Sequence, residues 1–269
     1  YHTHFAQAED HGGVIGGGPV VAGYVSGLHA RARRTLAPTP AVAARLRAAG
    51  VGDVGVLPRG VDTEQFSPVK RSTALRKRWG VFPGTPVALY AGALEAGPAL
   101  DRVLASFRAI QVHQPHARLV LVGDGPAPFL EREHPDVIIA GDRRGEDLAA
   151  HYASADLFLF PGEEAAFGNP VLQAMASGLP TVAFNTGVAA EQLASFHTGR
   201  LAPAGDARRF TLLATLLGHE ARLQLSLGEA ARHAALAFDW TRVGERFAHH
   251  LAEVAGDGAP EAPELAAEV

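Results

Sequence analysis

The sequence predicts an α/β protein whose parallel sheet is covered by helices on both faces. Between residues 87 and 184, five continuous apolar runs alternate with segments of helical periodicity. Strands that are buried on both faces read as continuous apolar runs, and a helix between two such strands makes them parallel. The chain has 269 residues, of which 47% are hydrophobic. That content is enough for one large domain or two small ones.

The first part of the chain predicts one helix between two short strands. Residues 12–20 are rich in glycine and predict a loop, because they lack the Gly-Lys-Ser/Thr sequence of a phosphate-binding P-loop. After a short apolar strand, Thr39 is expected as the N-cap of a helix and Pro40 as its first residue. Gly50 ends this helix, and the second strand covers residues 54–57.

The next stretch reads as a turn, a basic helix and a linker. Pro58 to Asp62 forms the turn, and the basic helix lies around residues 72–79. Two glycines and two prolines fall within residues 80–86, which is typical of a linker between domains.

Beyond the linker, the sequence predicts five strands and at least seven helices. The strands are expected at residues 87–92, 118–123, 137–141, 157–160 and 181–184. The helices between and after them are expected at 98–112, 126–133, 145–152, 169–177 and 188–194. Two or three more helices fill 206–250, and the tail from residue 256 is left without structure.

Composition excludes several classes of protein. The absence of cysteine excludes disulfides and cysteine chemistry. Lys and Arg number 24 against 28 acidic residues, but four of the acids lie in the tail after Val254, so the body of the chain is neutral. A neutral body argues against a dedicated nucleic-acid-binding protein. The sequence also has no long apolar run and no signal-peptide pattern, so the cytoplasm is the expected location.

Candidate binding positions lie in the loops that follow the predicted strands. In an open parallel sheet, ligands bind outside the carboxyl ends of the strands. Four such loops contain glycine, at residues 92–98, 123–126, 141–145 and 161–170.

The segment from Phe160 to Pro180 resembles the signature of retaining, nucleotide-sugar-dependent glycosyltransferases with the GT-B fold. Four further segments match the family pattern in the same order, and they cover residues 1–5, 57–66, 119–126 and 151–156. Together they look most like the branch of α-mannosyl- and sulfoquinovosyl-transferases, and the resemblance extends from Tyr1 to about Ala252.

This resemblance implies two Rossmann-like domains, of which the N-terminal one is incomplete here. The sequence enters the family pattern late in the acceptor-side domain, so the remaining half-domain has an open sheet edge and is expected to need a protein partner. The implied organisation is a remnant of the first domain at 1–80, a linker at 81–86, a donor-binding domain at 87–238, a C-terminal helix at 239–254 and a disordered acidic tail at 255–269.

The resemblance also implies a donor site without a metal or another cofactor. The donor substrate is a nucleotide-diphospho-sugar linked to GDP or UDP, and the acceptor is a lipid or a glycan. The positions expected to bind the nucleotide-sugar are Arg59, Gly92, Ala93, Pro98, Gly123, Asp124, Gly141, Arg143, Glu164, Phe167, Gly168, Asn169 and Gln173.

Four of the chemically important positions depart from the family pattern. Related enzymes supply an Arg and a Lys from the loop after the first donor-domain strand, and here Ala93 and Pro98 stand in those places. The family's pair of glutamates, spaced eight residues apart, is replaced by Ala165 and Gln173. Glu164 is one residue away from the first of these positions and is expected to point elsewhere. Gln173 can still bond a ribose hydroxyl through its amide.

Other side chains have two interpretations each. His2 matches a family histidine that lies near the cleft. A zinc site formed by His2 and His4 is the less favoured interpretation, because the sequence offers no third ligand nearby. Arg143 and Arg144 either replace the lost cations or are solvated surface charges.

The basic residues between Lys70 and Arg78 are more simply a solvated helix face than a membrane-binding surface, because no apolar stripe accompanies them. Peripheral association with the inner membrane face is the alternative.

Three hypotheses for the function follow. The leading one is a glycosyltransferase-family protein with a retained scaffold and impaired or lost transfer activity. The second is an active glycosyltransferase that is completed by a missing segment or a partner chain. The third is a subunit that binds a nucleotide or glycan, or acts as a scaffold, without chemistry.

Overall fold

The computed structural model describes residues 27, 29, 31–125, 128–162 and 170–256, without the side chains of Pro128 and Phe129. The chain divides into two compact units. The smaller unit combines Tyr1–Gly60 with Trp240–Glu268, and the larger unit is Val61–Asp239. Each unit is described by itself.

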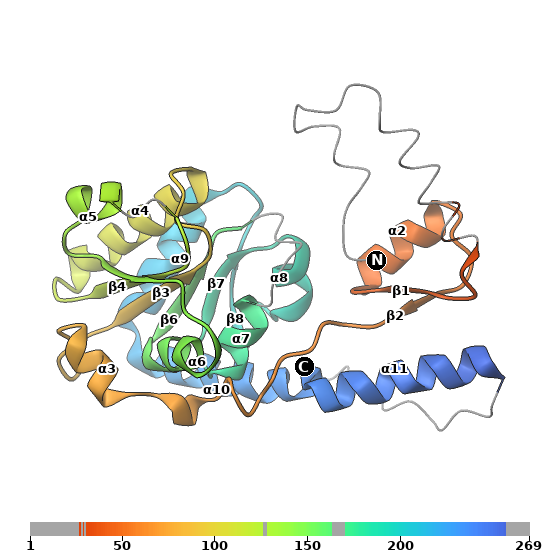
Figure 1. Ribbon diagram of the computed structural model, residues 1–269. Helices are drawn as coiled ribbons and strands as arrows, with labels where there is room; N and C mark the ends of the chain where they lie inside the picture. The colour runs from red at the N-terminus through yellow and green to blue at the C-terminus, as the bar shows by residue number, and fades with distance from the viewer. Residues whose placement is uncertain (1–26, 28, 30, 126–127, 163–169, 257–269) are drawn as a thin grey trace. The chain divides into compact units, whose positions relative to one another are not determined.

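The larger unit is built on a six-stranded parallel sheet (Figure 1). Its strands are β3 (Val87–Ala91), β4 (Arg118–Val122), β5 (Ile138–Gly141), β6 (Leu157–Phe160), β7 (Thr181–Phe184) and β8 (Gly199–Ala202). They lie in the order β5-β4-β3-β6-β7-β8, and every pairing is parallel. The first strand of this sheet, β3, lies in the middle. Strands β4 and β5 follow on one side of it and β6, β7 and β8 on the other, so the strand order reverses between β3 and β6. This point is the topological switch of a Rossmann-like sheet.

The five predicted strands are confirmed, and β8 is a sixth strand that the apolar pattern did not predict. The helices of this unit are α3 (Thr73–Arg78), α4 (Pro98–His113), α5 (Pro128–Glu133), α6 (Gly145–Ser154), α7 (Pro170–Ala176), α8 (Gly187–Gln192), α9 (Ala207–His219) and α10 (Ala221–Ala235). The five helices expected between the strands are therefore present, with ends that differ by no more than two residues.

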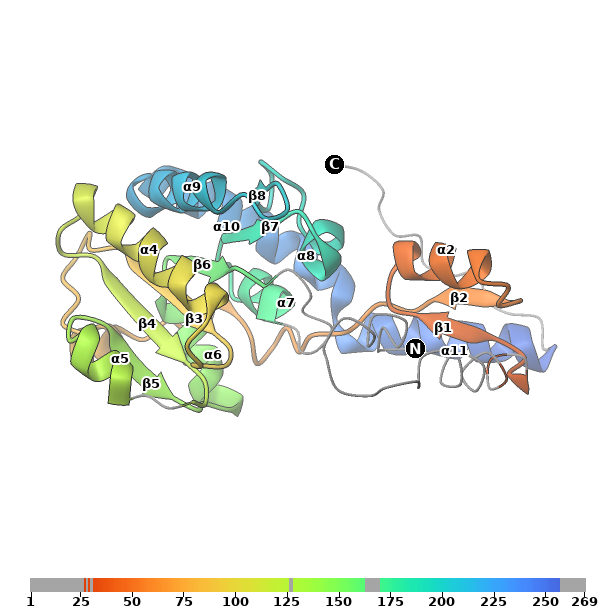
Figure 2. The ribbon, with the colours of Figure 1, turned by 90° about the horizontal axis from the view of Figure 1, so that it is seen from above.

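Helices cover both faces of this sheet, because side chains alternate along each strand. Ala88 and Leu119 point to the face that packs on α4, α5 and α9, and α4 and α9 lie side by side there (Figure 2). Leu89 and Val120 point to the opposite face, which packs on α3, α6, α7 and α10. The larger unit thus has two apolar cores separated by the sheet, as the continuous apolar strands predict.

Residues 61–80 belong to the larger unit, whereas the sequence pattern predicts them in the first domain. Phe66, Leu75 and Trp79 are 5%, 5% and 7% exposed and share a core with β3 and α6. Burial of these three large side chains joins the segment to the sheet that follows it.

The smaller unit contains a βαβ motif and the last helix. Strand β1 (Thr35–Ala37), helix α2 (Pro40–Ala48) and strand β2 (Val54–Val56) follow in order, and the two strands pair in parallel. The hydroxyl of Thr39 accepts a hydrogen bond from the amide of Val42 at 3.2 Å, so the predicted N-cap is confirmed.

Helix α11 (Trp240–Ala255) is held in this unit by polar contacts. Arg34 forms ion pairs with Asp53 and Glu253. One ring nitrogen of His250 lies 3.1 Å from the carbonyl oxygen of Val56 in β2. None of the described helices has the length and apolar content needed to cross a bilayer.

Candidate functional site

Two loops at the carboxyl edge of the sheet, next to the topological switch, are in direct backbone contact. The amide of Gly92 donates to the carbonyl of Val122, and that of Leu94 donates to the carbonyl of Asp124, both at 2.9 Å. A Cβ atom at Gly123 would lie 1.8 Å from the carbonyl oxygen of Gly92. Glycine is therefore required at residue 123 for the two loops to approach this closely.

The loop between β3 and α4 offers no cation. Ala93 and Pro98 are both exposed at this edge, and no Lys or Arg occurs between residues 92 and 98. The charged side chain of the loop is the acid Glu95, which is exposed. Helix α4 begins at Pro98, and the preceding Gly97 has no side chain to cap it. The loop can therefore offer an anion its backbone amides at a helix N-terminus, but no charged donor.

Asp124 and Gly141 contribute to the geometry of the same edge. The carboxylate of Asp124 is exposed and accepts a hydrogen bond from the amide of Gly125 at 2.9 Å. The carbonyl of Gly141 accepts from the amide of Gly123 at 3.0 Å, which joins the end of β5 to the neighbouring loop. Gly141 has a φ of +72°.

Arg143 and Arg144 are engaged in local contacts. Arg143 donates from Nε to the carbonyl of Ala140 at 2.7 Å and from Nη1 to Asp147 at 3.1 Å. Arg144 donates to Asp142 at 2.8 Å. Either side chain would have to exchange these contacts to bind a phosphate.

Gln173 lies on α7 with its side chain half-buried. Its side-chain amide makes no hydrogen bond to a residue that the structure describes, whereas its backbone carbonyl accepts from the amide of Ser177. Among the described residues, none occupies the side-chain amide in place of a ligand hydroxyl.

The remaining predicted positions lie either in the smaller unit or outside the described residues. Arg59 belongs to the smaller unit, where it is half-buried. The other predicted positions lie outside the described residues, and these are His2, Glu164, Ala165, Phe167, Gly168 and Asn169. His4 of the alternative zinc pair also lies outside them, and the described residues contain no cluster of three metal-binding side chains.

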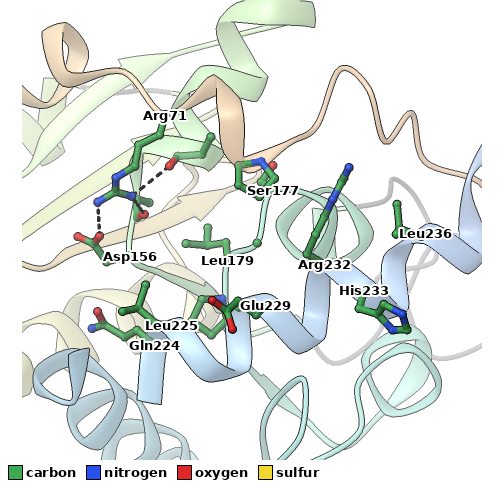
Figure 3. A pocket seen from close by; sticks show the side chains of 16 residues that line it. Arg71, Asp156, Ser177, Leu179, Gln224, Leu225, Glu229, Arg232, His233 and Leu236 are labelled. Atoms are coloured by element: carbon green, nitrogen blue, oxygen red, sulfur yellow. Dashed lines mark hydrogen bonds and ion pairs between the residues drawn. The ribbon is translucent and has the colours of Figure 1, made fainter. Parts of the chain in front are cut away.

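A cavity of about 560 Å³ lies at the opposite, amino edge of the sheet (Figure 3). Its walls come from the 3₁₀ helix η2 (Pro68–Lys70), the turns that precede β6 and β7, and helix α10. The sequence did not predict this cavity. Its lining residues are spread between positions 68 and 236, so no local motif marks the site.

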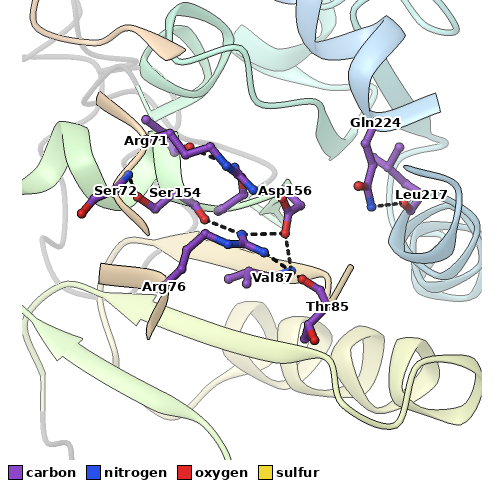
Figure 4. Close-up of polar contacts among 11 residues, drawn as sticks. Arg71, Ser72, Arg76, Thr85, Val87, Ser154, Asp156, Leu217 and Gln224 are labelled. Carbon is purple, nitrogen blue, oxygen red and sulfur yellow. Dashed lines mark hydrogen bonds and ion pairs between the residues drawn. The ribbon is translucent and has the colours of Figure 1, made fainter. Parts of the chain in front are cut away.

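A network around Asp156 holds the same edge together (Figure 4). The carboxylate accepts hydrogen bonds from Arg71 at 2.6 Å, from Arg76 at 2.9 Å and from the amide of Val87 at 2.8 Å. Lys70 pairs with Glu146 at 2.6 Å. Three members of the basic cluster therefore bond to the body of the larger unit, which favours a structural role for them over a membrane-binding one.

Comparison with known proteins finds matches among glycosyltransferases. Residues 85–217 match the family model described as "Glycosyl transferases group 1". The chain is 36% identical over 233 residues to a GDP-mannose-dependent alpha-mannosyltransferase of Mycobacterium tuberculosis. The matched region covers 85% of this chain and 59% of that protein. It is 33% identical over 224 residues to the sulfoquinovosyl transferase SQD2 of Arabidopsis thaliana, over 79% of this chain and 43% of that protein.

Solved structures agree on the fold. HepE of Anabaena, in complex with UDP and glucose, superimposes with a TM-score of 0.74 at 21% identity, over 94% of this chain and 70% of that chain. Sucrose-phosphate synthase of Thermosynechococcus elongatus gives a TM-score of 0.74 at 19% identity, over 95% and 67%. Of the two sequence relatives named above, the chain spans less than two thirds of the length. It contains a domain of the glycosyl transferases of group 1, with the Rossmann-like architecture of the GT-B fold.

Proposed function

We propose that this chain is a glycosyltransferase-family scaffold that binds a nucleotide-diphospho-sugar weakly and does not transfer the hexose on its own. The observation that carries the proposal is the loop between β3 and α4, where Ala93 and Pro98 are exposed and no Lys or Arg is present. In the family pattern, this loop supplies the cations that bind the donor diphosphate.

The chemistry of sugar transfer explains why this loop matters. When the sugar leaves a nucleotide diphosphate, negative charge grows on the β-phosphate, and the site must neutralise it. Removal of one such contact costs about 3 to 4 kcal/mol of transition-state stabilisation, which is roughly two to three powers of ten in rate. Glu95 and Asp124, the charged side chains in these two loops, have the wrong sign for this task.

Several groups support weak binding of the donor. The uncapped N-terminus of α4 presents backbone amides at the sheet edge, and the amide of Gln173 can bond a ribose hydroxyl. Arg143 and Arg59 are further candidates for the phosphates. The relative from Mycobacterium tuberculosis is named as GDP-mannose-dependent, which supports GDP over UDP as the nucleotide. The acceptor is a lipid or a glycan at the cytoplasmic face of the membrane, and no metal takes part.

Incubation of the purified chain with GDP-mannose and with UDP-glucose tests this function. Proton NMR should detect neither hydrolysis nor transfer to an added lipid or glycan acceptor, whereas calorimetry should detect weak heat from GDP. Robust turnover that disappears on His2→Ala would overturn the proposal.

A second candidate is an active enzyme that is completed by another segment or chain. It is favoured by the smaller unit, because β1 and β2 pair only with each other among the described strands and so leave an edge open on each side. The test adds the N-terminal part of a full-length relative in trans and measures transfer from GDP-mannose. Recovery of activity supports this candidate, and a stable complex without activity supports a non-catalytic binding or scaffold subunit.

A further inference from the structure

The cavity at the amino edge of the sheet has the size and position of a separate ligand site. Its volume of about 560 Å³ is within the range of roughly 300–1,000 Å³ that is typical of small-molecule sites. Asp156 and Pro180 line it directly before β6 and β7 begin. The loops proposed to bind the donor, at residues 92–98 and 123–126, follow the carboxyl ends of the strands. This cavity therefore lies at the other edge of the sheet.

The walls of this cavity are largely apolar and include side chains that remain exposed. Leu179 and Pro180 line it from the turn between α7 and β7. Leu225 and Leu236 line it from the side of α10, and they are 69% and 39% exposed (Figure 3). A ligand with an apolar body would remove this surface from water, which is favourable.

The polar groups of the cavity are mainly donors. Arg71 uses Nη1 for two backbone carbonyls and Nη2 for Asp156, so its Nε–H and one N–H of Nη2 make no hydrogen bond to a described residue. Arg232 uses Nη1 for the carbonyls of residues 63, 66 and 176, and its Nε and Nη2 make no hydrogen bond to a described residue. The oxygens of Asp156 already accept three hydrogen bonds.

Ser177 contributes a buried hydroxyl beside this cavity. The residue is 4% exposed and lines the cavity, and its hydroxyl has no hydrogen-bond partner within the described structure. A buried hydroxyl without a partner is costly, so a bound group that satisfies it is stabilised.

We propose that this cavity binds an amphipathic anion, with an apolar body against Leu179, Leu225 and Leu236 and an anionic head that accepts hydrogen bonds from Arg71 or Arg232. Glu229 also lines the cavity, but it is exposed, so water screens its charge from the head group. Two sources share this chemistry: a free organic acid and the anionic lipid of a membrane.

The probe for the test is 8-anilinonaphthalene-1-sulfonate, which combines an apolar ring system with one sulfonate. Its fluorescence should rise and saturate at one molecule per chain. Leu225→Glu should weaken binding about tenfold or more, because the apolar contact of Leu225 with the ring system is lost and a carboxylate takes its place. The matched control is Leu212→Glu on α9, since Leu212 is 55% exposed and does not line the cavity. The control should bind like the wild type.

A second variant tests the polar part of the site. Ser177→Ala should weaken the probe about fivefold through loss of one hydrogen bond, with no loss of protein stability. Displacement of the probe by decanoate identifies a free acid as ligand, and displacement by phosphatidylglycerol vesicles but not by phosphatidylcholine vesicles identifies a lipid. Absence of saturable binding, equal affinity of the Leu225→Glu and Leu212→Glu variants, or displacement by neither competitor would overturn the proposal.

Discussion

The two edges of the six-stranded sheet are built from different interactions. At the carboxyl edge, backbone hydrogen bonds and closely packed glycines such as Gly92 and Gly123 join the loops. At the amino edge, arginine side chains join the segments, and Arg71 and Arg76 both bond to Asp156 (Figure 4). The carboxyl edge thus depends on backbone geometry, and the amino edge depends on charge.

This difference fits the proposed function, in which the carboxyl edge has a changed chemistry and a retained shape. The side chains of Ala93 and Pro98 are exposed at the carboxyl edge and have no hydrogen-bonding group, whereas the carbonyl of Ala93 accepts from the Tyr90 hydroxyl at 3.1 Å. Substitution there is therefore expected to leave the fold intact. At the amino edge, the charged groups are themselves the framework.

Loss of the Asp156 carboxylate should be the most damaging change. Asp156→Ala leaves Arg76, whose side chain is 14% exposed, without its charge partner and also frees the amide of Val87. Removal of one partner from a largely buried ion pair costs about 3 to 5 kcal/mol. Urea denaturation should show this loss of unfolding free energy.

Asp142→Asn is the matched control for that variant. Asp142 pairs with Arg144, and their side chains are 50% and 87% exposed. Its loss should cost no more than about 0.5 kcal/mol. Equal effects of the two substitutions would contradict the proposed contrast between the edges.

A methyl group at Gly123 should be the next most damaging change. The new Cβ would lie 1.8 Å from the carbonyl oxygen of Gly92, and the φ of +147° also disfavours alanine. We expect Gly123→Ala to lower the unfolding free energy by about 3 kcal/mol. Gly141 has a φ of +72°, but the space around a new Cβ atom is open. Gly141→Ala should therefore lower the unfolding free energy by about 1 to 2 kcal/mol. Thermal denaturation of both variants checks this order.

His151 on α6 should produce a smaller effect that depends on pH. Burial lowers its pKa below the usual value near 6.5, and the nearby groups are Asp147, Arg143 and Arg78. As the pH falls below about 6.5, the unfolded chain takes up a proton before the folded chain does, so the free energy of unfolding decreases.

His151→Gln should reduce the loss of stability between pH 7.5 and pH 5.5, measured by urea denaturation at each pH. His116→Gln is the control, because His116 is exposed and should leave the pH dependence unchanged. A steeper pH dependence in His151→Gln would contradict the role of burial.

Much of the fold could be predicted because local signals and packing agree. Thr39 and Pro40 begin α2 as expected, and the continuous apolar runs become strands buried on both faces. Strand β8 was missed because Gly199–Ala202 contains an arginine and no apolar run. Its pairing with β7 decides its structure, and such pairing cannot be read from four residues.

The boundary of the larger unit was harder to predict than its elements. The glycines and prolines of residues 80–86 indicated a linker, but the side chains of Phe66, Leu75 and Trp79 attach the preceding segment to the larger unit. Three large apolar residues within a basic segment were a signal that could have been used.

The candidate donor positions Ala93 and Pro98 could be placed from the sequence because they follow a clear strand and precede a clear helix. The network around Asp156 could not be predicted from the sequence. It joins residues between 69 and 85 positions apart, and no sequence spacing indicates which arginine meets which carboxylate.

The affinity for GDP tests the central claim, that the donor edge retains its scaffold but lacks diphosphate-binding cations. Calorimetric titrations would compare the wild type with Ala93→Arg/Pro98→Lys and with Ala74→Arg/Pro115→Lys, which adds the same charges at exposed positions elsewhere. We predict about tenfold tighter binding for the donor-edge variant and no change for the control. Wild-type binding as tight as that of the donor-edge variant would contradict the claim.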